Sequence, residues 1–403
     1  MKTADAAPGP DDPAGDELPK TAWFAIAASV AAGVVAALQV GKASAALAAL
    51  RAEFGIGLGA AGWIVGIFAL LGVVGGVPAG LAVSRYGDRR FLLLGLVALA
   101  LGSAAGAAAP NFTLLLVTRV LEGAGFLFVL VAAPAVLERS ASARDRPLVF
   151  GIWGAFMPTG IVIALLAGLA IAPWRVVWLV NAGVAVVLAI VVRLAVEPGA
   201  DGRATGNLMH SLRAVVRLPK PLLLAGLFAL YNIQYFALVA FLPTLLVERI
   251  GLGPAAAALT TSAVVGVNIA GNLSAGVLRR RGIAPWRLIA TALSLMGVTG
   301  LGIFTPFAPV SLVIGLAMLF SLTAGLLPAT VLGEAPKAAP EPHMAPVVMG
   351  LVIQGNNLGQ LLGPATIGAL VDRLGWSAAA LAVAAAGLAG AALAVAARGL
   401  FRQ

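Results

Sequence analysis

The chain has 403 residues, of which 61% are hydrophobic and only 10% charged, and its mean hydropathy is +1.02. A soluble protein needs a more polar surface, so this composition excludes a soluble globular class and predicts that much apolar surface faces lipid. The sequence has no cysteine, which excludes disulfides, thiolate nucleophiles and thiolate metal sites. The formal net charge of +10 is interpreted by position, because basic loops orient membrane helices.

The first segment, residues 1–21, is polar and contains five acidic residues and four prolines. This composition predicts a disordered tail. The tail lacks the basic start and the early apolar core of a signal peptide, so we expect the first membrane helix to direct insertion.

Twelve apolar stretches follow, and a helix needs about 20 such residues to cross a bilayer. They are residues 22–50, 59–83, 91–109, 112–137, 147–171, 174–196, 221–247, 254–278, 285–306, 309–333, 345–371 and 376–397. The longest connection, 197–220, separates six spans from six. We therefore predict an all-α integral membrane protein of two pseudo-symmetric six-helix bundles, 22–196 and 221–403, the second ending in a short tail. Within the cytoplasmic linker 197–220, residues 208–218 form an amphipathic surface helix or a plain solvated connection.

Basic residues are distributed unevenly between the two sets of loops. With the N-terminus inside, twenty lysines and arginines fall in cytoplasmic segments and four in outer segments. This asymmetry predicts a multi-pass protein of a bacterial-type inner membrane with both termini in the cytoplasm. The net charge is then a topology signal, so the expected partner is the lipid bilayer and not a nucleic acid.

Two motifs in the first half narrow the fold. The loop after the second span reads Gly80-Leu-Ala-Val-Ser-Arg-Tyr-Gly-Asp-Arg-Arg90, and the fourth span contains Arg119-Val-Leu-Glu-Gly-Ala-Gly125. They resemble the loop signature Gly-x-x-x-Asp-Arg-x-Gly-x-Arg-Arg and the motif Arg-x-x-Gln-Gly-x-Gly of the major facilitator superfamily. Ser84 stands where that family usually has Asp, and Glu122 stands where it usually has Gln.

The resemblance implies a monomeric secondary transporter with no cofactor and no metal, which alternates access to a midplane site between its two halves. The expected ligands are a small molecule, best interpreted as an organic or inorganic anion, and a proton or other coupling ion. The run Gln39-Val-Gly-Lys42 is similar to the cyanate-permease and nitroimidazole-transporter branch. The alternative is a proton-driven multidrug exporter of the same superfamily, although the antiporter signature Gly-Pro-x-x-Gly-Gly is not intact in the fifth span.

Three charged residues lie inside predicted spans: Lys42 in the first, and Arg119 and Glu122 in the fourth. A charge at membrane depth costs at least about 2.5 kcal/mol on insertion scales. At the rise of a helix, Lys42 lies ~12 Å and the other two ~10–15 Å from the outer ends of their spans. We therefore expect one cluster of net charge +1. We interpret Lys42 and Arg119 as substrate-binding and Glu122 as proton-coupling; the structural alternative is that Glu122 only pairs with the cations.

The second half offers neutral polar groups instead of charges at this depth. We interpret six of them as substrate-binding: Tyr231, Asn232, Tyr235, Asn268, Gln354 and Asn357. Amide side chains also form interhelical hydrogen bonds, so a packing role stays open for them. No histidine falls within a span, which leaves Glu122 or the substrate itself to carry a coupled proton.

Contacts between residues of different spans are predicted at two places. The resemblance implies a gate that braces the outward-facing state, in which Glu138, at the inner end of the fourth span, lies near Arg85 or Arg89. The second and eleventh spans each carry glycines at every fourth residue: Gly72, Gly76 and Gly80, and Gly355, Gly359 and Gly363. Each set lies on one helix face, so we expect these two spans to pack against each other; the alternative is that each set packs within its own half.

The sequence disfavours two other classes of protein. A membrane-embedded enzyme needs a nucleophile with a base, or metal ligands, at membrane depth, and the spans contain no histidine, cysteine or paired carboxylates. A membrane sensor needs a soluble signalling domain, and the sequence does not predict one. Transport is therefore the predicted function.

Overall fold

The computed structural model describes residues 21–170, 173–199, 215–305, 308–341 and 344–401. The predicted tail and most of the predicted amphipathic helix of the linker lie outside these ranges. The described part of the N-terminal half contains helices α1 (Trp23–Ala45), α2 (Leu47–Phe54), α3 (Leu58–Gly66), η1 (Ile67–Ala69), α4 (Leu70–Tyr86), α5 (Asp88–Ala107), α6 (Phe112–Ser140), α7 (Arg146–Gly154), α8 (Phe156–Ala170) and α9 (Trp174–Ala195).

The C-terminal half begins two residues earlier than predicted. Its described helices are α11 (Pro219–Thr244), η2 (Leu245–Arg249), α12 (Pro254–Arg280), α13 (Pro285–Phe304), α14 (Val310–Ala324), α15 (Leu326–Glu334), η3 (Pro336–Ala338), α16 (Ala345–Leu374), α17 (Trp376–Ala396) and η5 (Arg398–Phe401). No strand occurs among the described residues of either half.

The helices account for the twelve predicted stretches. Among the described residues, ten helical segments are long and apolar enough to cross a membrane, and the bent pair α7–α8 makes an eleventh. The remaining stretch is α16, whose 30 residues extend ~45 Å and include several amide side chains. The all-α membrane fold predicted from the sequence is therefore confirmed.

Three predicted spans are broken near their centres, the second of them at η1, and proline explains the breaks in the other two. The fifth span bends by 40° between α7 and α8, and the tenth is interrupted between α14 and α15. Pro158 and Pro328 follow these breaks. A proline has no N–H to donate to the carbonyl four residues earlier, and its ring crowds that carbonyl. The carbonyls are those of Gly154 and Ala324, which are the last residues of α7 and α14.

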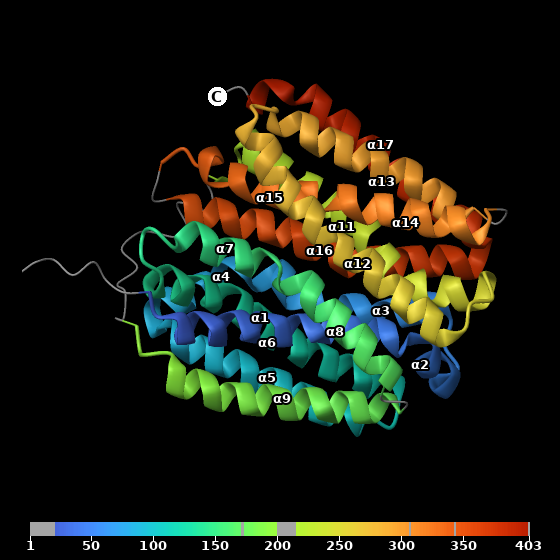
Figure 1. The fold of residues 1–403 in the computed structure, drawn as a ribbon, viewed down its shortest axis with the longest axis horizontal. Coiled ribbons are helices and arrows are strands. Elements are labelled where there is room, and N and C mark those ends of the chain that lie inside the picture. The colour runs from blue at the N-terminus through green and yellow to red at the C-terminus, as the bar shows by residue number, and fades with distance from the viewer. Residues whose placement is uncertain (1–20, 171–172, 200–214, 306–307, 342–343, 402–403) are drawn as a thin grey trace, which may run out of the picture.

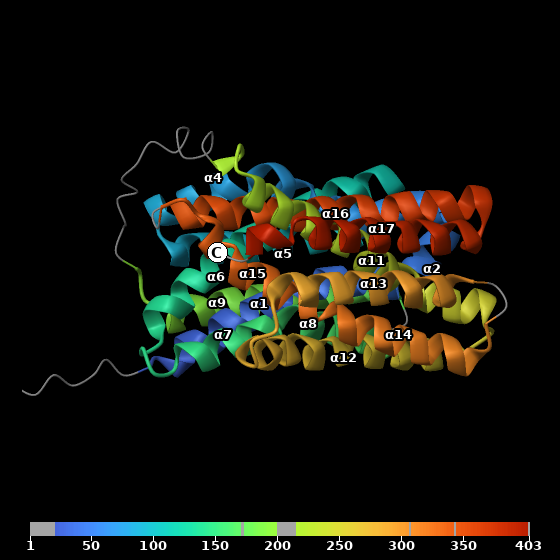
Figure 2. The ribbon, with the colours of Figure 1, turned by 90° about the horizontal axis from the view of Figure 1, so that it is seen from above.

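The long helices lie side by side along the long axis of the molecule, with α5, α6 and α9 at one side and α13 and α17 at the other (Figure 1). The start of α1, the end of α9 and the C-terminal end lie at the same end of the bundle (Figures 1 and 2). We call this end the terminal face, and the end that carries α2 the opposite face.

The second and eleventh spans pack against each other, as predicted. A β-carbon built on Gly72 of α4 would overlap the Asn357 side chain of α16, and one on Gly76 would lie 3.4 Å from Gln354 Cγ. Nearer the opposite face, Gly62 of α3 lies against the backbone of Pro364. Glycine thus lets the two spans approach along much of their length.

The predicted role of the glycines in the eleventh span was wrong. Gly355, Gly359 and Gly363 lie against backbone atoms of Ala225, Ala229 and Ile233 in α11. Those contacts are within the C-terminal half, which was the alternative considered from the sequence. Of the three glycines predicted to form a stripe in the second span, Gly80 does not contact α16 either. The nearest atom to a β-carbon built on Gly80 belongs to Val131 of α6, at 4.0 Å.

Polar contacts join the two halves at the opposite face. The Asp372 carboxylate of α16 accepts hydrogen bonds from the backbone N–H groups of Leu58 (2.9 Å) and Gly59 (2.7 Å) at the start of α3. Arg51 and Glu248 form a more exposed ion pair of 2.6 Å. A carboxylate at a helix N-terminus complements the helix dipole. These contacts hold the opposite face closed.

Replacing Asp372 by Asn should loosen this closed face, because the amide has no charge and offers one acceptor oxygen to the two N–H groups. The native chain has no cysteine, so a cysteine at Ala369, which lies beside Gly59, can report opening by maleimide labelling. We expect labelling to become about two to five times faster. Arg51→Gln removes only an exposed pair and should change the rate by less than about twofold. Equal rates in native and Asp372→Asn backgrounds would show that the cap does not hold the face closed.

Candidate functional site

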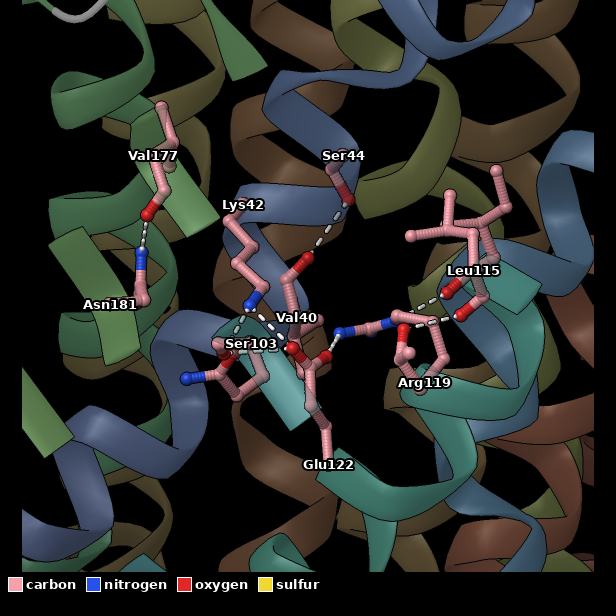
Figure 3. Close-up of polar contacts among 12 residues, drawn as sticks. Val40, Lys42, Ser44, Ser103, Leu115, Arg119, Glu122, Val177 and Asn181 are labelled. Atoms are coloured by element: carbon pink, nitrogen blue, oxygen red, sulfur yellow. Dashed lines mark hydrogen bonds and ion pairs between the residues drawn. The ribbon is translucent and has the colours of Figure 1, made fainter. Parts of the chain in front are cut away.

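The three charges predicted at one depth do form a cluster between α1, α5 and α6. Lys42 Nζ lies 2.7 Å from Glu122 Oε1 and donates a hydrogen bond of 2.7 Å to Ser103 Oγ. The other carboxylate oxygen of Glu122, Oε2, pairs with Arg119 Nη1. Figure 3 shows Glu122 between the two cations, which approach it from different sides. One carboxylate therefore bridges both cations.

The cluster is sealed from solvent. Lys42, Arg119 and Glu122 are each 0% exposed, as is Ser103. Arg119 Nε donates to the carbonyl of Ile64 (2.9 Å), while its Nη2 atom is buried with no partner among the described residues. Electrostatic interactions are strong in such an environment, and a net charge of +1 is costly there unless an anion balances it.

Glycines allow the helices around the cluster to approach closely. A β-carbon on Gly102 of α5 would lie 2.7 Å from Glu122 Cγ. On α6, Gly123 lies directly against the carbonyl of Phe68 in η1. This packing places Glu122 next to Ser103, one residue after Gly102, and brings η1 against α6. The glycines that follow Glu122 in its motif therefore have a packing role as well.

Three contributors to the cluster were not identified from the sequence. Ser103 Oγ lies 2.8 Å from Glu122 Oε1 and 3.1 Å from Gln39 Oε1. The Lys42 ammonium lies 4.5 Å from the ring centroid of Trp178 in α9, a distance typical of a cation–π contact. Gln39 had a detectable signal, because it precedes Lys42 by three residues and shares its helix face. Ser103 and Trp178 lie in spans that contribute no other residue to the cluster, so the sequence did not identify them.

The predicted residues of the C-terminal half form separate small groups. The rings of Tyr231 and Tyr235 stack with centroids 5.6 Å apart, and Asn268 donates to the carbonyl of Ser321 at 3.0 Å. Asn232 donates to Asn356 Oδ1 at 2.8 Å. Tyr231, Tyr235, Asn232 and Asn268 are at most 5% exposed; the two asparagines join helices, whereas the tyrosine stack lies within α11.

The amide side chains of α16 differ in burial and in their hydrogen-bond partners. Asn357 is buried and donates to the carbonyl of Ile353 within its own helix (2.8 Å), whereas Gln354 is half-buried. Gln360 is fully buried, and neither of its amide atoms has a partner among the described residues. Within that part of the chain, no hydrogen bond or ion pair joins the charge cluster to the C-terminal polar groups.

The gate pair, which was predicted for the outward-facing state, is not formed in this structure. Glu138 lies 2.9 Å from Arg146, Arg85 lies over the ring of Tyr86, and Arg89 Nη2 donates to the Arg193 carbonyl. The fourth span instead contacts the loop signature one residue further on, where Arg139 pairs with Asp88 at 2.7 Å. One residue turns a helix by ~100°, so motif position alone did not identify which side chain faces the loop.

The family can now be stated from comparison with known proteins. A model described as the Major Facilitator Superfamily matches residues 29–352. The chain belongs to the major facilitator superfamily. Over 350 residues this transporter is 30% identical to a chloramphenicol resistance protein of Streptomyces lividans, covering 83% of this chain and 88% of that protein. Over 177 residues it is 28% identical to a galactose-proton symporter of Escherichia coli K12, covering 43% and 37% respectively.

The fold has a solved counterpart. The transporter matches a crystal structure of a bacterial homolog to the human lysosomal transporter Spinster, in an inward-facing and unoccupied conformation, with a TM-score of 0.73. The match covers 94% of this chain and 96% of that one at 15% identity, so it shows the fold alone. Family and fold together identify a membrane transporter and not an enzyme.

Proposed function

We propose that this transporter moves a small organic or inorganic anion together with a proton, by alternating access between its two halves. The observation that supports the proposal most strongly is the charge cluster. Lys42 and Arg119 share a single carboxylate in a fully buried site, and Arg119 Nη2 has no partner among the described residues. A bound anion would lower the positive charge of the cluster and supply the missing hydrogen-bond acceptor.

Proton coupling follows from competition between Glu122 and the anion for the two cations. With Glu122 ionised the cluster carries +1, and protonation of Glu122 raises this to +2. Binding of a monovalent anion to the released cations returns the cluster to +1. An ionised Glu122 occupies donors of both cations and competes with the anion for them, and protonation of Glu122 releases these donors. The proposal is therefore that the proton and the anion bind together, which is symport.

The orientation and the conformational state complete the proposal. The monomer lies in a bacterial-type inner membrane with the terminal face towards the cytoplasm, as the basic residues indicate. Asp372 joins the halves at the opposite face, whereas Asp88 and Glu334 at the terminal face pair with Arg139 and Arg279 of their own halves. This distribution supports an inward-facing state. Tyr231, Asn268 and the amides of α16 would contact the substrate as the helices rearrange.

Lys42→Ala tests the anion site. The variant leaves the Arg119–Glu122 pair intact but reduces the cluster charge to zero, so anion binding should weaken about 10- to 100-fold through loss of a hydrogen bond to a charged group. Binding is measured by thermal shift with a panel of anions, since a ligand of the native state raises its apparent stability. Lys42→Arg should restore part of the response, because its fork has a different reach.

The control for this test is Lys337→Ala, which removes a 56% exposed lysine far from the cluster and should bind anions like the native chain. Uptake into liposomes gives an independent measure. If Lys42→Ala transported and bound anions normally, Lys42 would not belong to the substrate site.

A proton-driven multidrug exporter is the second candidate. It is favoured by the likeness to the chloramphenicol resistance protein over most of both chains. A cluster of net positive charge disfavours cationic drugs but tolerates neutral ones. Drug resistance and anion uptake are measured in cells that express the transporter. Drug resistance that survives Lys42→Ala supports the exporter. Loss of both drug resistance and anion uptake in this variant supports the anion site.

A further inference from the structure

A cavity lined by arginines lies at the terminal face, away from the charge cluster. It has a volume of about 300 Å³ and lies where the end of α4, the start of α5 and the residues after α9 meet. Three guanidinium groups line it, from Arg89, Arg90 and Arg193, and Tyr86 and Leu93 complete its aromatic and apolar walls. The volume is sufficient for a phosphate group and the small polar group attached to it.

The cavity has an unbalanced positive charge. Arg89 Nη2 is held by the Arg193 carbonyl at 2.5 Å, while Arg89 Nε is buried without a partner among the described residues. Among the described residues, no carboxylate lines the cavity. Asp88 stands between the lining residues Gly87 and Arg89 in the sequence, and its carboxylate already pairs with Arg139 at 2.7 Å. The lining arginines therefore retain donors for an anion.

Apolar side chains continue from the cavity along the outer surfaces of α5 and α9. Leu94 and Val97 of α5 are 52% and 46% exposed, and Leu194 and Ile190 of α9 are 78% and 58% exposed. Tyr86 is 49% exposed, and tyrosine is enriched at the level of lipid headgroups. A charged cavity beside an exposed apolar strip matches the boundary between the headgroups and the acyl chains of a bilayer.

We propose that this cavity binds the phosphate group of an anionic headgroup, with the acyl chains of the lipid along α5 and α9. Guanidinium groups bind phosphate oxygens in paired hydrogen bonds, and a basic pocket on the cytoplasmic side meets the leaflet where anionic lipids give a negative surface potential. The site is separate from the transport cluster, so its occupancy does not depend on which substrate the transporter moves.

The test compares lipid binding by the full chain in detergent. Native mass spectrometry measures bound phosphatidylglycerol against phosphatidylcholine, and thermal shift measures the response to phosphatidylglycerol, glycerol phosphate and inorganic phosphate. The test variant is Arg90→Gln with Arg193→Gln. The control is Arg144→Gln with Arg281→Gln, which makes the same change of charge at exposed positions outside the cavity. We expect the test variant to lose about tenfold in preference for phosphatidylglycerol, and the control to keep it.

Each outcome decides the proposal. A response to phosphatidylglycerol alone identifies a lipid headgroup as the source of the phosphate, and a response also to glycerol phosphate extends the site to free phosphate esters. Equal lipid preference in the test variant and the native chain would overturn the proposal, as would a loss of equal size in the control. If the double variant does not fold, Arg90→Gln alone gives the same comparison, because Arg90 is exposed and is not needed for packing.

Discussion

Replacing Glu122 by Gln should abolish proton-driven accumulation while exchange and binding of anions survive. The change removes the carboxylate that holds Lys42 and Arg119, so two buried cations lose their counter-ion. Removing one partner of a buried ion pair destabilises a protein by about 3–5 kcal/mol. The variant should therefore unfold at a clearly lower temperature than the native chain, and anions should restore more of its stability than they add to the native chain.

The matched control is Glu138→Gln. It makes the same substitution on the same helix, but Glu138 is 53% exposed in its pair with Arg146, and such pairs contribute at most about 1 kcal/mol. Accumulation driven by a pH gradient in liposomes and thermal unfolding with and without anions provide the two measurements. Accumulation by Glu122→Gln with unchanged pH dependence would reduce Glu122 to a structural counter-ion.

The charge cluster could be predicted because it depends on depth, and depth follows from counting residues. Lys42 lies towards the opposite-face end of the first span, and Glu122 lies towards the same end of the fourth span, which runs the other way (Figure 1). The helical rise fixes both heights with little error. The high cost of a lone charge in a membrane then requires the opposite charges to meet. The structure places them 2.7 Å apart.

The neighbour that each helix face contacts was predicted less well, because the sequence does not identify which helices pack together. Glycines at every fourth residue define one helix face, but either neighbouring helix can fill that face. In α16, Gly355 and Gly359 face α11, while the neighbouring Asn357 meets Gly72 of α4. At the terminal face Arg139 likewise faces Asp88 while Glu138 points to Arg146, and the gate pair stays a prediction for the outward-facing state.

The contact between the two halves also depends on glycines of α3 that were not among those predicted from the sequence. Gly59, Gly62 and Gly66 of α3 share a face and lie against backbone or side-chain atoms of α16. At Gly62 the space is smallest, because a β-carbon would overlap the carbonyl of Pro364. A backbone carbonyl cannot rotate out of the way as a flexible side chain can, so any larger residue at this position forces the two helices apart.

Gly62→Ala should therefore inhibit transport strongly. Overpacking costs about 1–3 kcal/mol, and this cost falls on the state in which the opposite face is closed. Alanine also favours the helix by about 1 kcal/mol relative to glycine, but that gain applies to both conformational states and does not offset the shift between them. Since each cycle must pass through the closed state, turnover should fall about tenfold or more, while labelling of a cysteine at Ala369 should become faster.

The matched control for this prediction is Gly76→Ala, on the same span and against the same partner helix. Its β-carbon would lie 3.4 Å from Gln354 Cγ and 3.7 Å from the Gly350 carbonyl, which is ordinary van der Waals contact, so transport should stay within about twofold of native. Initial uptake rates and maleimide labelling in liposomes measure both variants. If Gly62→Ala matched Gly76→Ala in both measurements, the close approach at Pro364 would not be needed for the transport cycle.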